Sequence, residues 1–349
     1  MLDAGLGLRV LSLFDGISCG RVALKRAGIP VSSYYASEVD KHAKTVSHAN
    51  WGGSIVQVGD VTGISLKKLG YVPDLIIGGS PCQGFSFAGR QLNFNDPRSA
   101  LFFDYVRLLN EAKELNPNVK FLLENVKMKK EYLDIISSQV GVQPVCINSA
   151  LVSAQNRVRY YWANWEFGQP EDKGLELVDI IDDRYPTAEY IITASHLRRF
   201  DTSTDIQKKF TAIDPRKAIC MTARQYANWK GNYVTCGQVV GRKINPATGK
   251  RDDYNPDIIA EQRIELRADK KTNCLTTVQK DNVLVRDAVY RKLTPIECER
   301  LQTLPDGYTA SVANTHRYKA LGNGWTVDVI AHILTALRRE LHIPRHRSL

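Results

Sequence analysis

Short apolar runs alternate with longer amphipathic segments along the chain from Leu8 to Trp165. The apolar runs predict strands at residues 8–14, 34–37, 55–58, 74–77, 121–123, 145–151 and 160–164. Helices are predicted at 20–27 and 99–115, and the second of these begins after Asp96-Pro97 and ends near Pro117. Strands that alternate with helices predict an α/β fold with a doubly wound, mostly parallel sheet.

Polar side chains follow five of these predicted strands, at the point where each strand ends. They are Asp15, Glu38, Asp60, Cys82 and Glu124. Parallel strands end at one edge of a sheet, and ligands bind beyond that edge. The pattern therefore predicts one shared active site.

The alternation breaks between about residues 165 and 288, where the predicted elements shorten and basic residues mix with tyrosine and tryptophan. A faint repeat relates 217–222 to 271–276, which fits either two similar β-rich units or chance. Regular patterns return after residue 290, with helices predicted at 294–301 and 326–341. We therefore expect a discontinuous sheet domain, 1–168 and 289–349, and a smaller β-rich domain, 169–288.

The net charge of the chain indicates what kind of partner it binds. The chain of 349 residues has a formal net charge of +10, which favours a polyanionic partner, with nucleic acid as the first candidate. No apolar run approaches the ~20 residues of a membrane helix, so no membrane association is expected. The N-terminus lacks the pattern of a signal peptide. We expect a cytoplasmic, nucleoid-associated protein of a prokaryotic or phage-infected cell.

The seven cysteines are widely spaced, and the closest two are Cys220 and Cys236. No Cys-x-x-Cys pair is present, so neither a zinc site nor a redox pair is expected, and no other metal site is predicted. Without a secretory signal, a disulfide framework is not expected either. A reactive cysteine would have to act alone, with partners from elsewhere in the fold.

Cys82 is the candidate nucleophile, because it directly follows a proline in the stretch GGSPCQGFSFAGR, residues 78–90. A free thiol is only a few per cent thiolate at neutral pH, so it needs a lowered pKa or a nearby base. Arg157 and Arg159, on one alternating face at the start of a predicted strand, could supply positive charge. The ordinary alternative for Cys82 is a buried core thiol, and the ordinary alternative for the two arginines is a surface cluster of ion pairs.

Two carboxylates are further candidates. Glu124 could be held protonated by desolvation and act as an acid, or it could be a solvated or helix-capping carboxylate. Glu38 ends the second predicted strand, downstream of the Gly16 turn, where an acid commonly binds ribose hydroxyls. It could also be a solvated residue at a strand end.

Taken together, these stretches resemble the DNA (cytosine-5) methyltransferase family over most of the chain except about 170–288. Six motifs in order carry the resemblance: Leu13-Phe-Asp-Gly16, Ser80-Pro-Cys-Gln83, Glu124-Asn-Val126, Gln155-Asn-Arg-Val-Arg159, Arg291-Lys-Leu-Thr-Pro-Ile-Glu-Cys298 and Gly322-Asn-Gly-Trp-Thr-Val327. The chain is most similar to the bacterial or phage type, with some features like the vertebrate de novo enzymes. It departs from the family at Ser12, where an acid is usual, at Asp15, which replaces a small residue, and at Trp325.

The resemblance implies a methyltransferase fold that uses S-adenosylmethionine, and double-stranded DNA as the partner. A methyl group would pass to C5 of a flipped-out cytosine in a specific duplex sequence, through a covalent bond between Cys82 and C6. Glu124 would act at N3, Arg159 near O2, and Arg157 would complete the catalytic set. No side chain in the sequence is identified as the base that removes the C5 proton.

The resemblance also implies the binding residues. The cofactor candidates are Phe14, Asp15, Gly16, Ser18, Gly20, Glu38, Val39, Asp60, Val61, Ser80, Asn323 and Trp325. The DNA-contact candidates are Gln83, Ser86, Arg90, Arg98, Arg224, Gln225, Tyr226 and Asn228. The loop 83–90 would close over the DNA, and 169–288 would be the target-recognition domain.

Two other functions stay open at this point. One is a tRNA cytosine-5 methyltransferase, although the long stretch between Trp165 and Arg291 favours DNA. The other is a catalytically inert, methyltransferase-like protein that binds nucleic acid, against which the intact Cys82 and Glu124 argue. We expect a monomer on DNA, with a cognate restriction endonuclease as a candidate partner.

Overall fold

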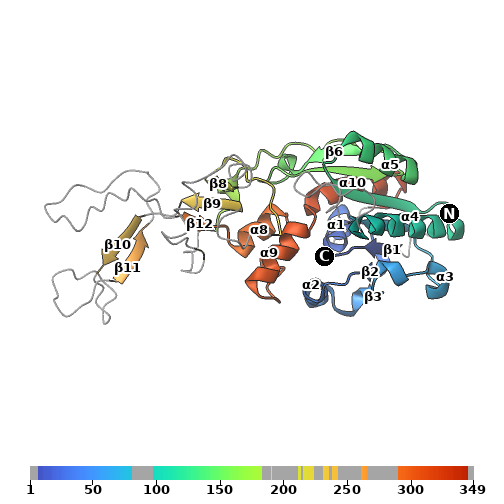
Figure 1. The fold of residues 1–349 in the computed structure, drawn as a ribbon, viewed down its shortest axis with the longest axis horizontal. Helices are drawn as coiled ribbons and strands as arrows, with labels where there is room; N and C mark the ends of the chain where they lie inside the picture. Colours follow the sequence, from blue (N-terminus) through green and yellow to red (C-terminus); the bar gives the residue numbers. More distant parts are fainter. Residues whose placement is uncertain are drawn as a thin grey trace. The chain divides into compact units, whose positions relative to one another are not determined.

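The computed structural model describes residues 7–80, 97–182, 190, 211–213, 215–223, 231–235, 238–242, 261–265 and 290–344 (Figure 1). The chain divides into two compact units. Unit 1 contains Met1–Asp182, Arg216–Tyr226 and Pro295–Leu349, and unit 2 contains Asp183–Pro215 and Ala227–Thr294. Two stretches that the sequence places in the smaller domain, 169–182 and 216–226, therefore belong to unit 1.

Unit 1 is built on a seven-stranded sheet with the order β3-β2-β1-β4-β5-β7-β6. The strands are β1 (Leu8–Leu13), β2 (Val31–Ser37), β3 (Val56–Gln57), β4 (Leu75–Gly78), β5 (Lys120–Val126), β6 (Val145–Asn148) and β7 (Val158–Ala163). The first five pair in parallel, and β7 runs antiparallel between β5 and β6. The predicted doubly wound, mostly parallel sheet is confirmed. The chain order reverses between β1 and β4, where ligands bind in such sheets.

Within its described residues, unit 1 has the helices α1 (Cys19–Ala27), α2 (Lys41–Trp51), α3 (Leu66–Leu69), α4 (Pro97–Leu115), α5 (Lys130–Val140), α8 (Pro295–Leu301), α9 (Asn314–Asn323) and α10 (Val327–Glu340). Local chemistry sets several of their ends. The side chain of Asp40 caps α2 by accepting from the backbone N–H groups of His42 and Ala43. Gly28 and Gly141 end α1 and α5 in the left-handed conformation. No helix within the described ranges is long and apolar enough to span a membrane.

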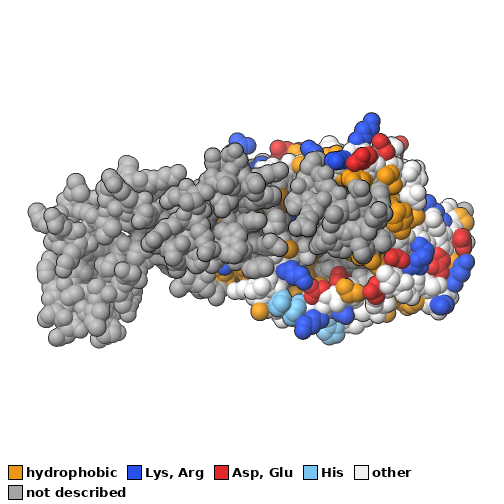
Figure 2. Space-filling model, viewed as in Figure 1, with side chains coloured by type: hydrophobic (Ala, Val, Ile, Leu, Met, Phe, Trp, Pro, Cys, Tyr) orange, Lys and Arg blue, Asp and Glu red, His pale blue; other side chains and the backbone are white. Residues whose placement is uncertain are grey.

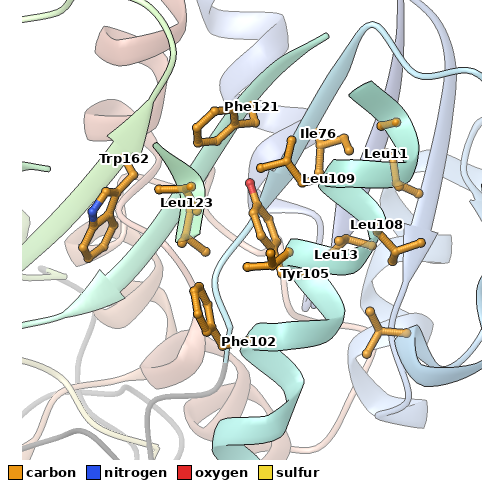
Figure 3. Close-up of a cluster of buried hydrophobic side chains, with 14 of the residues drawn as sticks. Leu11, Leu13, Ile76, Phe102, Tyr105, Leu108, Leu109, Phe121, Leu123 and Trp162 are labelled. Carbon is orange, nitrogen blue, oxygen red and sulfur yellow. The ribbon is translucent and has the colours of Figure 1, made fainter. Parts of the chain in front are cut away.

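One apolar core lies between α4 and the sheet, as Figure 3 shows. Phe102, Tyr105 and Leu109 of α4 are fully buried against strand residues such as Ile76 and Leu123. Helices α1 and α10 pack against each other. On the visible face of the described part, acidic and basic side chains are interspersed (Figure 2). The core holds the strand ends in fixed positions, and the site is built on those ends.

Unit 2 contributes five strands within its described residues. Strands β12 (Tyr290–Lys292), β9 (Gly231–Thr235) and β8 (Thr211–Ile213) form one sheet in that order. Strands β10 (Gln238–Arg242) and β11 (Glu261–Glu265) form an antiparallel pair. These strands agree with the β-rich character expected for the smaller domain.

Candidate active site

A cavity of about 320 Å³ opens at the carboxyl ends of β1, β2 and β4, beside β5. Ten of the predicted site residues line it: Phe14, Asp15, Gly16, Glu38, Ser80, Glu124, Arg157, Arg159, Asn323 and Trp325. Most of them come from the ends of strands on both sides of the point where the strand order reverses, whereas Asn323 and Trp325 come from the end of α9 and the residues after it. The fold therefore brings most of the predicted cofactor and acid residues to one place.

The turn after β1 holds a buried carboxylate, Asp15. It accepts hydrogen bonds from the hydroxyls of Ser12 (2.6 Å), Ser18 (2.5 Å) and Tyr34 (2.7 Å). Burial raises the pKa of Asp15 to about 6, although the three hydroxyl donors oppose that rise. Ser12, where the family has an acid, is thus a donor to Asp15, and the carboxylate comes from position 15 instead.

The backbone of this turn is strained. Phe14 has φ 56° and Ser18 has φ 60°, in the left-handed region that non-glycine residues seldom adopt. The hydroxyl of Ser18 also lies 2.7 Å from that of Ser47. These buried hydrogen bonds stabilise the strained turn at the cavity wall.

Glu38 ties the end of β2 to the same turn. Its Oε2 accepts from the backbone N–H of Gly16 at 2.7 Å, and its Oε1 accepts from those of Val39 (2.8 Å) and Asp40 (2.7 Å). Gly16 has φ 60°, which favours glycine at this position. Oε2 accepts one of these three bonds, so Glu38 keeps an acceptor position there for a hydroxyl group of a ligand.

Glu124 lies inside β5, which extends beyond the predicted strand end to Val126. Arg159 contacts it through Nε–Oε1 at 3.0 Å, and the indole Nε1 of Trp325 donates to Oε2 at 3.1 Å. In the antiparallel register of β5 and β7, Arg159 lies opposite Val126 and so diagonally from Glu124 on one face. The acid is therefore held from two sides at the cavity wall.

Arg157 is buried and donates to backbone carbonyls. Its guanidinium contacts the oxygens of Met221 (3.0 Å), Gly322 (3.2 Å) and Gly324 (3.0 Å). A Cβ on Gly322 would lie 2.3 Å from the backbone of Thr222, so glycine is required at that position. Arg157 thus joins the start of β7 to the segment that contains Met221 and to the stretch 322–324.

The segment 216–223, which the sequence placed in the smaller domain, runs along this site. The backbones of Ala218 and Ala154 pair at 2.8 Å, and the N–H of Met221 donates to Gln155 Oε1 at 2.7 Å. These bonds explain why the segment belongs to unit 1.

Sequence reasoning missed Cys220, which lies in this segment. Its Sγ is 3.4 Å from Arg157 Nη1 and 3.8 Å from Arg159 Nη2. Burial raises the pKa of the Cys220 thiol, but the two guanidiniums outweigh that effect, so the pKa lies below its ordinary value. The faint repeat at 217–222 was the one signal in the sequence that pointed to this segment.

Sequence reasoning also missed a pair of histidines on the cavity wall. The rings of His42 and His316 stack with centroids 3.4 Å apart, and both residues line the cavity. Beside them, Lys319 Nζ contacts Asp40 Oδ2 at 2.7 Å. These residues join α2 to α9, and no local sequence pattern links positions so far apart.

Five cofactor candidates lie outside the cavity lining: Ser18, Gly20, Val39, Asp60 and Val61. Val39 is 67% exposed, whereas Val61 belongs to the apolar core. Asp60 caps a short 3₁₀ turn by accepting from the N–H of Thr62. A Cβ on Gly20 would lie 2.4 Å from the side chain of Ile77, so Gly20 allows close packing of α1 on the sheet.

The remaining candidates fall outside the described residues. They are the nucleophile Cys82 and the DNA-contact candidates Gln83, Ser86, Arg90, Arg224, Gln225, Tyr226 and Asn228, together with the side chain of Arg98.

A family model described as C-5 cytosine-specific DNA methylase matches residues 8–339 of this chain. The chain belongs to this family. The type II methyltransferase M.SsoII of Shigella sonnei is 30% identical over 329 residues, which cover 92% of this chain and 78% of that protein. The type II methyltransferase M.HhaI of Haemophilus parahaemolyticus is 27% identical over 349 residues, covering 94% and 93%.

Solved structures agree in fold. A mutant of DNMT2 from Spodoptera frugiperda superposes with a TM-score of 0.65 at 20% identity, covering 94% of this chain and 99% of that one. The predicted methyltransferase fold is therefore confirmed, and the protein is an enzyme, a DNA (cytosine-5) methyltransferase. Family and fold together imply the use of S-adenosylmethionine.

Proposed function

We propose that this enzyme methylates C5 of a flipped-out cytosine in a specific duplex DNA sequence, through a covalent bond between Cys82 and C6. One observation carries the proposal. Asn125 Nδ2 donates to Ser80 Oγ at 3.1 Å, which joins the acid motif to the chain just before Cys82. The paired Glu124 and Arg159 therefore lie beside the start of the nucleophile motif.

The chemistry explains why these groups belong together. C5 of cytosine is a poor nucleophile. When a thiolate adds to C6 while Glu124 delivers a proton to N3, the electrons shift so that C5 becomes enamine-like. S-adenosylmethionine supplies the electrophilic methyl group. Loss of the C5 proton to a base then expels Cys82 as thiolate, and N3 returns its proton to Glu124.

Two residues assist Glu124 in different ways. Arg159 contacts the carboxylate directly and would lie near O2 of the base. Arg157 donates to carbonyls of the site wall, so we assign it a positioning role. Flipping the cytosine costs a few kcal/mol of stacking and pairing, which contacts elsewhere on the DNA would offset.

The size and lining of the cavity support S-adenosylmethionine as its ligand. Its volume of about 320 Å³ lies within the range of small-molecule sites. We propose that Glu38 binds the ribose hydroxyls and that Asp15 binds the ammonium group of the methionine end. The rings of Phe14 and Trp325 offer apolar walls for the rest of the molecule.

Asp15→Asn should weaken S-adenosylmethionine binding and stabilise the free protein. The pKa of Asp15 is about 6 when folded, against 3.8 for an unperturbed aspartate, so the folded protein favours the protonated form. The cost of the buried charge therefore grows as pH rises from about 4 to 6, to ~3 kcal/mol. At pH 8 the variant should melt at a higher temperature than wild type, and the difference should shrink toward pH 4.

Calorimetric titration of the same two proteins with S-adenosylmethionine at pH 8 measures the cofactor affinity. An Asp15→Asn variant that binds S-adenosylmethionine as tightly as wild type would exclude Asp15 from the cofactor site.

Glu38→Ala should weaken S-adenosylmethionine binding by roughly 10- to 100-fold. The variant loses hydrogen bonds from hydroxyls to a charged carboxylate, each worth about 1.5–3 kcal/mol. Calorimetry measures the loss of affinity. Because Glu38 also accepts from the N–H of Gly16, thermal melting without cofactor shows whether the variant has destabilised the turn after β1. Unchanged cofactor affinity would leave Glu38 with a purely structural role.

We propose that residues 169–288 select the DNA sequence. This stretch lies outside most of the family motifs and places basic side chains beside aromatic ones, as in Arg224 to Lys230, and base-edge contacts rather than phosphate contacts choose a sequence. Arg224, Gln225, Tyr226 and Asn228 are the proposed base readers, and each good bidentate contact is worth ~1–3 kcal/mol of discrimination. Gln83, Ser86, Arg90 and Arg98 would contact DNA near the flipped base.

Transfer of tritium from labelled S-adenosylmethionine tests the function directly. Duplex DNA should accept label, and tRNA or buffer alone should not. Bisulfite sequencing of plasmid from an expressing cell should then show methylation confined to one short sequence. Label in tRNA alone would make the enzyme a tRNA methyltransferase, and label in neither substrate would support the inert alternative.

A further inference from the structure

We infer that Trp325 is a positioning residue that fixes the carboxyl group of Glu124 for proton transfer. The inference rests on the proposed function of Glu124. The indole Nε1 donates to Oε2 at 3.1 Å, while Arg159 Nε contacts Oε1 at 3.0 Å. Each oxygen of the carboxyl group therefore has its own donor, and the two donors together set the plane of the group.

The indole ring is itself tightly held. A Cβ on Gly79 would lie 3.0 Å from Trp325 Nε1 and 2.7 Å from Glu124 Oε2, so the end of β4 passes close to both groups. On another side, a Cβ on Gly20 of α1 would lie 3.5 Å from Cζ3 of the ring. The ring thus lies between α1, the end of β4 and the acid in β5.

The backbone around Trp325 is equally fixed. The carbonyl of Gly324 accepts from Arg157 Nη2 at 3.0 Å and from Gln302 Nε2 at 3.2 Å. The hydroxyl of Thr326 donates to Gln302 Oε1 at 2.8 Å. Because these bonds hold both neighbours of Trp325, its N–H is a rigid donor rather than an adjustable one.

This rigidity bears on the reaction because a proton donor must lie within hydrogen-bond reach of the atom it serves. Without the indole N–H, Oε2 loses the donor that Trp325 supplies. The contact between Oε1 and Arg159 alone does not fix the plane of the carboxyl group, so the group can rotate. Trp325 also lines the cavity that holds Glu38 and Asp15. Trp325 therefore lies in the same cavity as the proposed cofactor residues and contacts the proposed acid, Glu124.

Trp325→Phe tests the inference, because it keeps an aromatic ring and removes only the N–H and the second ring. Single-turnover methyl transfer should slow by roughly 10- to 100-fold, the worth of a hydrogen bond to a charged group. The Kd of S-adenosylmethionine should stay within about threefold of wild type, since the ring wall remains.

Trp165→Phe is the matched control. It removes an indole N–H that donates to the carbonyl of Ile333 at 3.0 Å, in α10 and away from the acid. We expect lowered stability with unchanged transfer. In a Glu124→Gln background, Trp325→Phe should cost less than twofold further, because residues that act as one unit are not additive.

Gly79→Ala provides a second variant if Trp325→Phe fails to fold. Its methyl group would enter the gap between Nε1 and Oε2 and should also slow transfer at least 10-fold. The inference is overturned by unchanged transfer in Trp325→Phe, by a loss confined to the KM for cofactor, or by a full penalty in the Glu124→Gln background. Wild type that transfers no methyl group would instead refute the proposed function itself.

Discussion

Replacing Cys82 with alanine should abolish methyl transfer and leave affinity for duplex DNA within about threefold of wild type. The thiolate is needed to activate C5, and without it no other step of the reaction can begin. Phosphate and base contacts, which determine DNA affinity, do not involve the thiol. Tritium transfer and a gel-shift titration measure the two quantities on the same preparation.

A covalent adduct provides the sharper measurement. On DNA that carries 5-fluorocytosine at the target, fluorine replaces the proton that must leave, so wild type should remain attached to the DNA after denaturation. Cys82→Ala should form no adduct. Wild-type turnover on normal DNA with no adduct on the fluorinated DNA would remove Cys82 from its role.

Cys220 makes a matched control necessary. Its thiol lies beside Arg157 and Arg159, and the charges of these arginines outweigh burial and lower its pKa, so it is a second candidate thiol next to the site. Cys220→Ser should still form the adduct, because the resemblance assigns the nucleophile to position 82. An adduct that survived in Cys82→Ala and disappeared in Cys220→Ser would reverse the assignment.

The sheet could be predicted because buried parallel strands are nearly continuous apolar runs. Strands β1 and β4 agree with the predicted runs to within one residue. Helices α2 and α9 could not be predicted in the same way. Only Ala43, Val46 and Ser47 of α2 are buried, so its sequence carries no broad apolar stripe.

The convergence of Asp15, Glu38 and Glu124 at one edge follows from their places at or near the carboxyl ends of strands, and the sequence predicted it. The partners of these carboxylates could not be predicted. Glu124 and Trp325 are 201 positions apart in the chain, and the diagonal contact with Arg159 depends on β7 running antiparallel to β5. Periodicity reports neither the direction of a strand nor its neighbours.

The three hydroxyls that donate to Asp15 are also contacts that the sequence could not predict. The sequence marks Ser12 and Asp15 as two separate departures from the family. The hydrogen bond of 2.6 Å between them shows that the departures are coupled, since the hydroxyl of Ser12 donates to the carboxylate of Asp15. Only the geometry of the turn after β1 reveals such a pair.

Glu124→Gln should slow methyl transfer by ~100- to 10,000-fold, the usual worth of a positioned proton donor. Glutamine has nearly the shape of glutamate but carries no acidic proton. The amide also conflicts with its surroundings. If its oxygen stays on Arg159, its NH₂ group faces the N–H of Trp325, so two donors oppose each other. The variant therefore loses both the proton and one of the two bonds that hold the acid.

Single-turnover transfer, cofactor calorimetry and the 5-fluorocytosine adduct together separate these effects. Affinity for S-adenosylmethionine should stay within a few-fold, because Glu38 and Asp15 are unchanged. Adduct formation should slow along with transfer, since addition of the thiolate to C6 is the step that N3 protonation assists. If transfer slowed while the adduct formed at the wild-type rate, Glu124 would act after the covalent bond has formed. A variant within a few-fold of wild type in both measurements would show that another group protonates N3.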